Sequence, residues 1–164
     1  MPMSIRLFYD RWPQYNRRLM EAIGALTDEQ LALRPSPEHW PVWALVGHVA
    51  GTRVYWLCTV LGEPGAEATP FTDPGGDGWE DDLDHPRTAR ELIGALETTY
   101  AVIDGVLERW TPDDLAVEFT RTRPSGTRSL SRQWVVWHLM EHDLHHGGEI
   151  SLILGMHGVP ALDL

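Results

Sequence analysis

Cysteine, basic residues and long apolar runs are all scarce in this chain. Its 164 residues include a single cysteine, Cys58, so an intramolecular disulfide is excluded. The 13 Lys and Arg residues stand against 24 Asp and Glu residues, which gives a formal net charge of −11. Because nucleic-acid binding depends on basic side chains that neutralise phosphates, we expect no nucleic-acid partner.

The apolar residues are dispersed along the chain. Nowhere do about 18 of them run together, and residues 1–6 hold no uninterrupted apolar stretch. The sequence therefore predicts neither a membrane-spanning helix nor a membrane partner, and it indicates a cytoplasmic protein.

The length and the hydrophobic content of 43% predict one domain over residues 1–164. Eight tryptophans supply large surfaces for a core. Cys58 follows Trp56 and Leu57 in an apolar setting, where an unassisted thiol is inert. We therefore interpret Cys58 as a core residue rather than a nucleophile.

Apolar residues recur at helical spacing in four long segments. These segments are residues 4–25, 42–61, 88–110 and 131–155. Pro13 interrupts the first segment, and it either kinks that helix or marks its true start. With no run of convincing strands, the chain is predicted to be all-α, and its four helices are predicted to form a bundle.

Two connecting segments stand out between these helices. Residues 62–86 are rich in Gly, Pro, Asp and Glu, which predicts a long crossover or a lid, or else a disordered acidic loop. The acidic cluster at 80–84 resembles a calcium site in composition but lacks the ligand spacing of an EF-hand. Residues 116–129 alternate enough to allow a short hairpin before the last helix.

Four of the eight histidines fall within nine residues of the last predicted helix, at His138, His142, His145 and His146. Imidazole is the commonest protein metal ligand, and two imidazoles four residues apart on a helix can bind one ion. The alternative is that these histidines cap helix ends or form hydrogen bonds within the bundle without a metal. The density of histidines in this segment favours a metal centre.

Helix phase separates these four histidines. An advance of about 100° per residue places His142 and His146 in the same sector as the apolar residues Val135, Leu139, Ile150 and Ile153. The other two histidines lie towards Trp134 and Leu152. The pair on the apolar sector is therefore predicted to face the core.

A divalent ion needs at least a third protein ligand, which must come from another helix. His48 is the best candidate, because it shares the inward face of the 42–61 helix with Leu45 and Val49. His39, His85 and His157 lie outside such a face. Three neutral imidazoles suit zinc, nickel, iron or cobalt and leave positions open for water or substrate. The charge of the ion would lower the pKa of bound water or of a bound thiol.

Several motifs along the chain resemble those of one family. They are residues 26–31 and 35–42 before the second helix, 131–138 and 141–150 in the last helix, and 154–160 at its end. In order and spacing they resemble the DinB-like (YfiT-like) family, which includes metal-dependent thiol transferases. The resemblance implies an up-down-down-up four-helix bundle with metal ligands at His48, His142 and His146. It also implies one divalent ion, zinc or nickel before iron, cobalt or manganese.

Two positions depart from the family pattern. Gly147 stands where the family often has a basic residue, and Glu149 stands where it often has a glutamine. Glu149 is therefore our candidate catalytic residue, either as a hydrogen-bond partner of a ligand histidine or as a proton acceptor. The alternative is a solvated helix residue.

Three functions remain open at this point. The resemblance implies an enzyme that activates a low-molecular-weight thiol, such as bacillithiol or mycothiol, for transfer to a small electrophilic substrate. A hydrolase using metal-bound water and a non-catalytic metal-binding stress-response protein are the alternatives. The resemblance also implies a homodimer, which would need exposed apolar helix faces.

The other conspicuous side chains can be explained by structural roles. Arg53 and Arg132 could contact an anionic substrate, but surface positions explain them as well. Five tryptophans lie at helical spacing and are expected in the core or a dimer interface rather than in a substrate cage. They are Trp12, Trp56, Trp110, Trp134 and Trp137.

Overall fold

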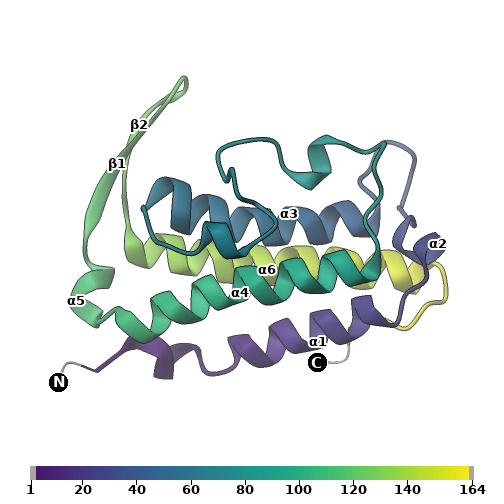
Figure 1. Cartoon of the computed structure of the whole chain (residues 1–164), viewed down its shortest axis with the longest axis horizontal. Coiled ribbons are helices and arrows are strands. Elements are labelled where there is room, and N and C mark those ends of the chain that lie inside the picture. The colour runs from purple at the N-terminus through teal and green to yellow at the C-terminus, as the bar shows by residue number, and fades with distance from the viewer. Residues whose placement is uncertain (1–2, 163–164) are drawn as a thin grey trace.

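The computed structural model describes residues 3–162 and is mostly helical. The long helices are α1 (Trp12–Gly24), α3 (Val42–Val54), α4 (Ala89–Arg109) and α6 (Arg132–Met156). The short helices are α2 (Asp28–Leu31) and α5 (Pro112–Leu115). Helix α4 packs against α1 and α3, and α3 packs against α6. In Figure 1, α1 and α6 run in one direction while α3 and α4 run in the other.

Side-chain caps begin four of these helices, and two of the four, α4 and α6, begin within one residue of the predicted starts. Thr27, Thr88, Thr111 and Ser131 each accept a hydrogen bond from a backbone N–H in the first helical turn. Of the two alternatives for residues 4–25, the structure shows the second: the helix starts beside Pro13 rather than being kinked there. A 3₁₀ helix (Ile5–Tyr9) comes first, and α1 then begins with Pro13 in its first turn. Proline is tolerated there because backbone N–H groups of the first turn have no partner within the helix.

Helix α3 is buried on almost every side, because α4, α6 and the long loop surround it. The sequence predicts a regular helix to residue 61. Instead, α3 gives way at Tyr55 to a π-helical segment (Tyr55–Val60). Such wider turns are frequent at functional sites, and this one turns Tyr55 and Trp56 towards a cleft described below.

The hairpin forms, so the chain is not purely α-helical. Strands β1 (Glu118–Arg123) and β2 (Gly126–Ser131) pair antiparallel, and Gly126 has a φ of 127° at the turn between them. Phe119 and Leu130 pack against the core, and the tip of the hairpin projects near the start of α6 (Figure 1).

The interpretation of the tryptophans holds for most of them. Trp12, Trp56 and Trp110 are buried, and Trp134 is partly buried against the same core cluster. Trp137 is 58% exposed on α6, so it is not a core residue of the monomer. Cys58 is half-buried against the core, and burial raises the pKa of its thiol.

A buried ion pair joins the helices beneath the histidine cluster. Arg53 on α3 is 0% exposed and donates hydrogen bonds to both carboxylate oxygens of Asp143 on α6, at 2.7 and 3.2 Å. Trp12 on α1 also donates to Asp143, and Arg53 donates to the Leu96 carbonyl on α4. Both interpretations of Arg53 from sequence, surface and substrate contact, are therefore wrong. Buried charges persist when they are paired and fully hydrogen-bonded, and this pair fixes α3 against α6.

Candidate metal centre

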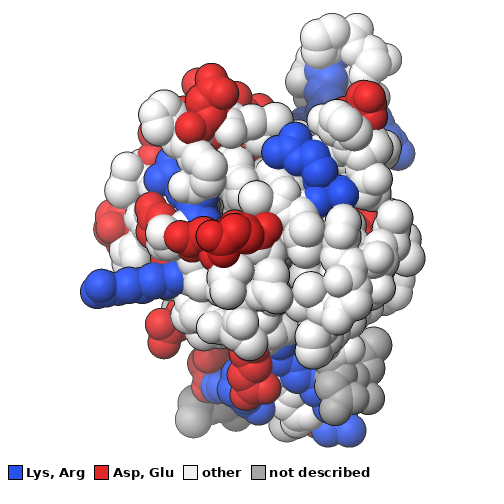
Figure 2. Space-filling view, turned by 90° about the vertical axis from the view of Figure 1, so that its right-hand side faces the viewer, with Lys and Arg blue, Asp and Glu red and all other residues white. Residues whose placement is uncertain are grey.

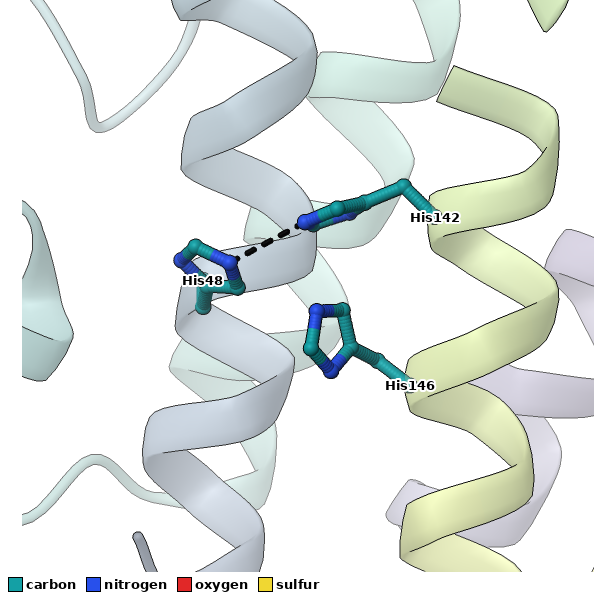
Figure 3. Close-up of side chains that lie close together, drawn as sticks. All are labelled: His48, His142 and His146. Atoms are coloured by element: carbon teal, nitrogen blue, oxygen red, sulfur yellow. Dashed lines mark hydrogen bonds between the residues drawn. The ribbon is translucent and has the colours of Figure 1, made fainter. Parts of the chain in front are cut away.

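Three histidines converge between α3 and α6. His48 comes from α3, and His142 and His146 come from successive turns of α6 (Figure 3). One ring nitrogen from each lies within 4.8 Å of the others, and the Nε2 atoms of His48 and His142 are 3.0 Å apart. All three side chains are partly buried. Helix phase and the inward face of α3 thus select residues that meet in space.

Two carboxylates hold the outer nitrogens of these rings. The Nδ1 atom of His48 lies 2.7 Å from a carboxylate oxygen of Glu80, and the Nδ1 atom of His146 lies 2.5 Å from Glu149. A carboxylate accepts, so Nδ1 carries the proton in both rings and Nε2 keeps its lone pair. This pairing directs two lone pairs into the space between the three rings.

The surroundings of His142 and His146 favour the neutral form of these two rings. Burial, followed by the nearby His146 and His48 rings, lowers the pKa of His142 to about 3. Burial also lowers the pKa of His146, although Glu149 opposes this shift. Near pH 7 a cation would therefore not have to displace the second proton of an imidazolium from these two rings.

The donor set fits a cation better than it fits a hydrogen-bond network. With Nδ1–H of His48 and His146 given to carboxylates, only His142 has a hydrogen to offer inside the cluster, and it serves one acceptor at a time. At least one inward lone pair then lacks a donor. His142 Nδ1 is also buried without a hydrogen-bond partner in residues 3–162. No acceptor therefore holds the ring hydrogen of His142 on Nδ1, the nitrogen that points away from the cluster. A divalent ion would be held by His48, His142 and His146.

The remaining histidines of the cluster lie elsewhere. His138 stacks on Trp134, with ring centroids 4.7 Å apart, and its ring is 5.8 Å from that of His142. His145 is exposed and its Nε2 lies 3.7 Å from Glu149. Neither belongs to the converging triad, although His145, His146 and Glu149 form a second, more exposed group. His39 bonds to Ser36 at the surface.

Glu80 is the residue that sequence reasoning missed. It lies on the long loop, which is ordered over α3 and includes a 3₁₀ turn (Trp79–Asp81). A Cβ added to Gly47 would lie 3.0 Å from Trp79, and one added to Gly51 would lie 3.3 Å from Phe71. These glycines, on either side of His48, let the loop approach and bring Glu80 to the imidazole. In the sequence, the aromatic residues Phe71 and Trp79 within the acidic segment were the available indication that this loop packs on a helix.

We expect Glu80→Ala to weaken divalent-metal binding about 10- to 100-fold, because carboxylates that orient ligand imidazoles have effects of this size. Isothermal titration of the metal-free protein measures this. Asp84→Ala is the matched control, since it removes an equal charge from an exposed position of the same loop. Equal dissociation constants for the two variants would show that Glu80 does not orient His48 for a metal.

Clefts open on two sides of the triad. One, of about 410 Å³, reaches His48 and His142 and is walled by the π-helical segment, the long loop and Arg123 of the hairpin. The other, of about 510 Å³, reaches His146 and Glu149 and is lined by Trp40, Leu152 and Ile153. The three histidines therefore lie between a polar cleft and a more apolar one.

Comparison with known proteins agrees with this architecture. The family model of the DinB superfamily matches residues 14–150, so the chain belongs to that superfamily. A DinB-like protein from Bacillus cereus is 21% identical, with a TM-score of 0.66 over 100% of this chain and 99% of that chain. A conserved protein from Enterococcus faecalis is 15% identical, with a TM-score of 0.68 over 93% of this chain and 99% of that one.

A DinB-like protein from Bacillus subtilis is 16% identical, with a TM-score of 0.60 over 92% of this chain and 90% of its own. At these identities the likeness concerns the fold alone. No curated protein sequence matches this chain. No helix within residues 3–162 combines the length and the apolar character needed to cross a membrane.

Proposed function

We propose that this protein is a divalent-metal-dependent enzyme that activates a low-molecular-weight thiol, of the bacillithiol or mycothiol kind, for S-transfer to an electrophile. The observation that carries the proposal is the convergence of His48, His142 and His146 beside an accessible cleft. Three protein ligands with an open side are typical of catalytic rather than structural zinc sites. Zinc or nickel is the expected ion, with iron, cobalt and manganese as the other candidates.

A bound ion would supply Lewis-acid activation, which lowers the pKa of a coordinating thiol towards neutrality. The chain supplies the proton acceptor. Glu149, predicted from sequence, faces the apolar cleft while its other oxygen holds His146. Glu80 borders the polar cleft, and its second carboxylate oxygen is buried without a partner in residues 3–162. The thiol proton would pass to one of these carboxylates as sulfur bonds to the electrophilic atom, whose leaving group departs with the bonding pair.

The two clefts favour group transfer over hydrolysis. A transferase must place two substrates against one reacting centre, and the cavities on either side of the triad provide space for both. The walls of the two clefts differ in polarity, which suits a polar thiol in one cleft and an apolar electrophile in the other. Hydrolysis by an activated water needs only one of these spaces and is the second candidate.

The test is a screen of the metal-loaded protein with bacillithiol, mycothiol and glutathione against monobromobimane as a generic electrophile. Metal-dependent thiol consumption with at least one thiol is expected, and it should be absent from the His142→Ala variant. Loss of the electrophile by water alone would favour the hydrolase. A lack of reaction with a protein that binds metal tightly would favour a non-catalytic metal-binding protein, for example one active in a stress response.

We further propose that the protein acts as a cytoplasmic homodimer. Trp137, Leu144 and Leu152 are at least half exposed along α6, and Leu7 and Phe8 are exposed near the start of the chain. Exposed apolar side chains on helix faces suit a symmetric interface.

A further inference from the structure

The hairpin carries three arginines on one face. In the register of the strands, Arg121 pairs with Arg128 and Arg123 pairs with Gly126. Side chains alternate between the two faces of a strand, so Arg121, Arg123 and Arg128 share the face of Phe119 and Leu130. Since those two residues pack on the core, the three arginines lie on the side of the hairpin that faces the bundle.

These arginines are poorly neutralised within residues 3–162. Arg53 pairs with Asp143 and Arg109 with Glu63, but no ion pair to a carboxylate involves Arg121, Arg123 or Arg128. Arg121 instead donates to the Tyr55 hydroxyl and lies over the Trp56 ring, 4.4 Å from its centroid. In Figure 2 the projection at the upper right carries blue basic side chains beside a red acidic one, and the body beneath it shows both colours.

The direct opposition of Arg121 and Arg128 is unfavourable in itself. Like charges at facing positions of antiparallel strands destabilise the pair. The acidic residue of the hairpin, Glu118, lies on the opposite face, where it accepts from Ser129. In a chain with 24 acidic residues, an acid could readily have been placed beside the arginines. An anion from solution would relieve this repulsion.

The arginine face encloses a groove of about 210 Å³. Its floor is formed by Trp56, Trp134 and His138, whose rings pack with centroids 4.7–5.3 Å apart. Arg121, Arg123 and Arg128 form its wall. Trp56, Arg123 and His138 also line the cleft that reaches His48 and His142, so the groove continues into the candidate metal centre.

We propose that this arginine groove is a binding site for an anionic group, a carboxylate or a phosphate, at one end of an elongated substrate. The guanidinium fork matches both groups with two parallel hydrogen bonds, and the chain uses arginine for all 13 of its basic residues. The aromatic floor would hold the middle of the molecule. The expectation that the other end of the substrate reaches the histidine triad rests on the proposed function. Anion binding by the groove does not depend on that function.

The test is a titration of the metal-free, full-length protein with inorganic phosphate and, separately, with succinate at constant ionic strength, followed by calorimetry. We expect one of the two anions to bind, and the double variant Arg123→Gln/Arg128→Gln to raise its dissociation constant at least about tenfold, as loss of charge-assisted bidentate bonds does. The double variant Arg17→Gln/Arg90→Gln is the matched control, because these arginines are exposed on α1 and α4 and their loss changes the net charge equally. Its dissociation constant should be that of the wild type.

The two probes separate the two sources of the anionic group. Preferential binding of phosphate supports a phosphorylated substrate, and preferential binding of succinate supports a substrate with carboxylates. The single variant Arg128→Gln provides a second measurement, because removing one of two opposed charges should leave the melting temperature unchanged or higher while anion binding weakens. Equal binding by wild type and the hairpin variants, or no binding of either anion, would overturn the proposal and leave the arginines as protection of the strand edges.

Failure here and failure of the proposed function are distinguishable. The titration needs neither metal nor thiol, so an anion site can be present in a protein that never consumes thiol. A metal-dependent thiol reaction that is indifferent to Arg123→Gln/Arg128→Gln would preserve the enzyme and remove only the groove.

Discussion

His142→Ala and His146→Ala are each expected to remove most bound divalent metal, whereas His39→Ala leaves the metal content unchanged. The first two side chains point into the triad, and the loss of one leaves two imidazoles, which are too few to hold a divalent ion firmly. His39 bonds to Ser36 at the surface and is not one of the three converging histidines. Elemental analysis of the three purified variants after dialysis against buffered zinc or nickel measures the effect.

His145→Ala sharpens this comparison. His145 is the neighbour of His146 and is exposed, so its variant tests whether metal binding follows the triad or the density of histidines on α6. We expect nearly full metal content in His145→Ala. Equal metal content in His142→Ala, His146→Ala and His39→Ala would eliminate the triad as the binding site.

Asp143→Ala is expected to destabilise the metal-free protein by about 3–5 kcal/mol, because it leaves a fully buried guanidinium without its counter-charge. Arg53 would keep only its bonds to the Leu96 carbonyl and to Thr99, and Trp12 would lose its acceptor. The free energy of unfolding from urea titration, followed by tryptophan fluorescence, measures the loss.

Glu141→Ala is the matched control, since it removes a carboxylate from an exposed position of the same helix. Its effect should stay within about 0.5 kcal/mol, as is usual for surface substitutions. Exchange of the ion pair for apolar residues, in Arg53→Met/Asp143→Leu, should recover part of the stability lost in Asp143→Ala. A stability of Asp143→Ala equal to that of Glu141→Ala would mean that the pair does not fix α3 against α6.

Helix boundaries followed from local chemistry. Thr88 and Ser131 cap the helices that the apolar spacing predicts, because capping and helical periodicity are decided by neighbours a few residues apart. The π-helical turn at Tyr55 was not predictable, since it depends on how α3 packs against the loop and hairpin. The split of the first helix at Pro13 was one of two open alternatives, and the chain takes the one that leaves proline in the first turn.

The candidate site was predictable where it depends on helix phase. His142 and His146 share a face because they are four residues apart, and His48 lies among apolar residues that had to point inward. Arg53 was misjudged because its partner Asp143 is 90 residues away along the chain. Glu80 was missed for the same reason, as only the packing of the long loop on α3 brings it to His48.

X-ray absorption at the metal edge of the loaded, full-length protein tests the central claim most directly. The account predicts three imidazole nitrogens at about 2.0–2.1 Å from zinc and at least one further position taken by a small exchangeable ligand. Addition of a thiol substrate should place sulfur at about 2.3 Å in that position. A shell closed by four protein ligands, or an ion whose shell is unchanged in His142→Ala, would contradict it.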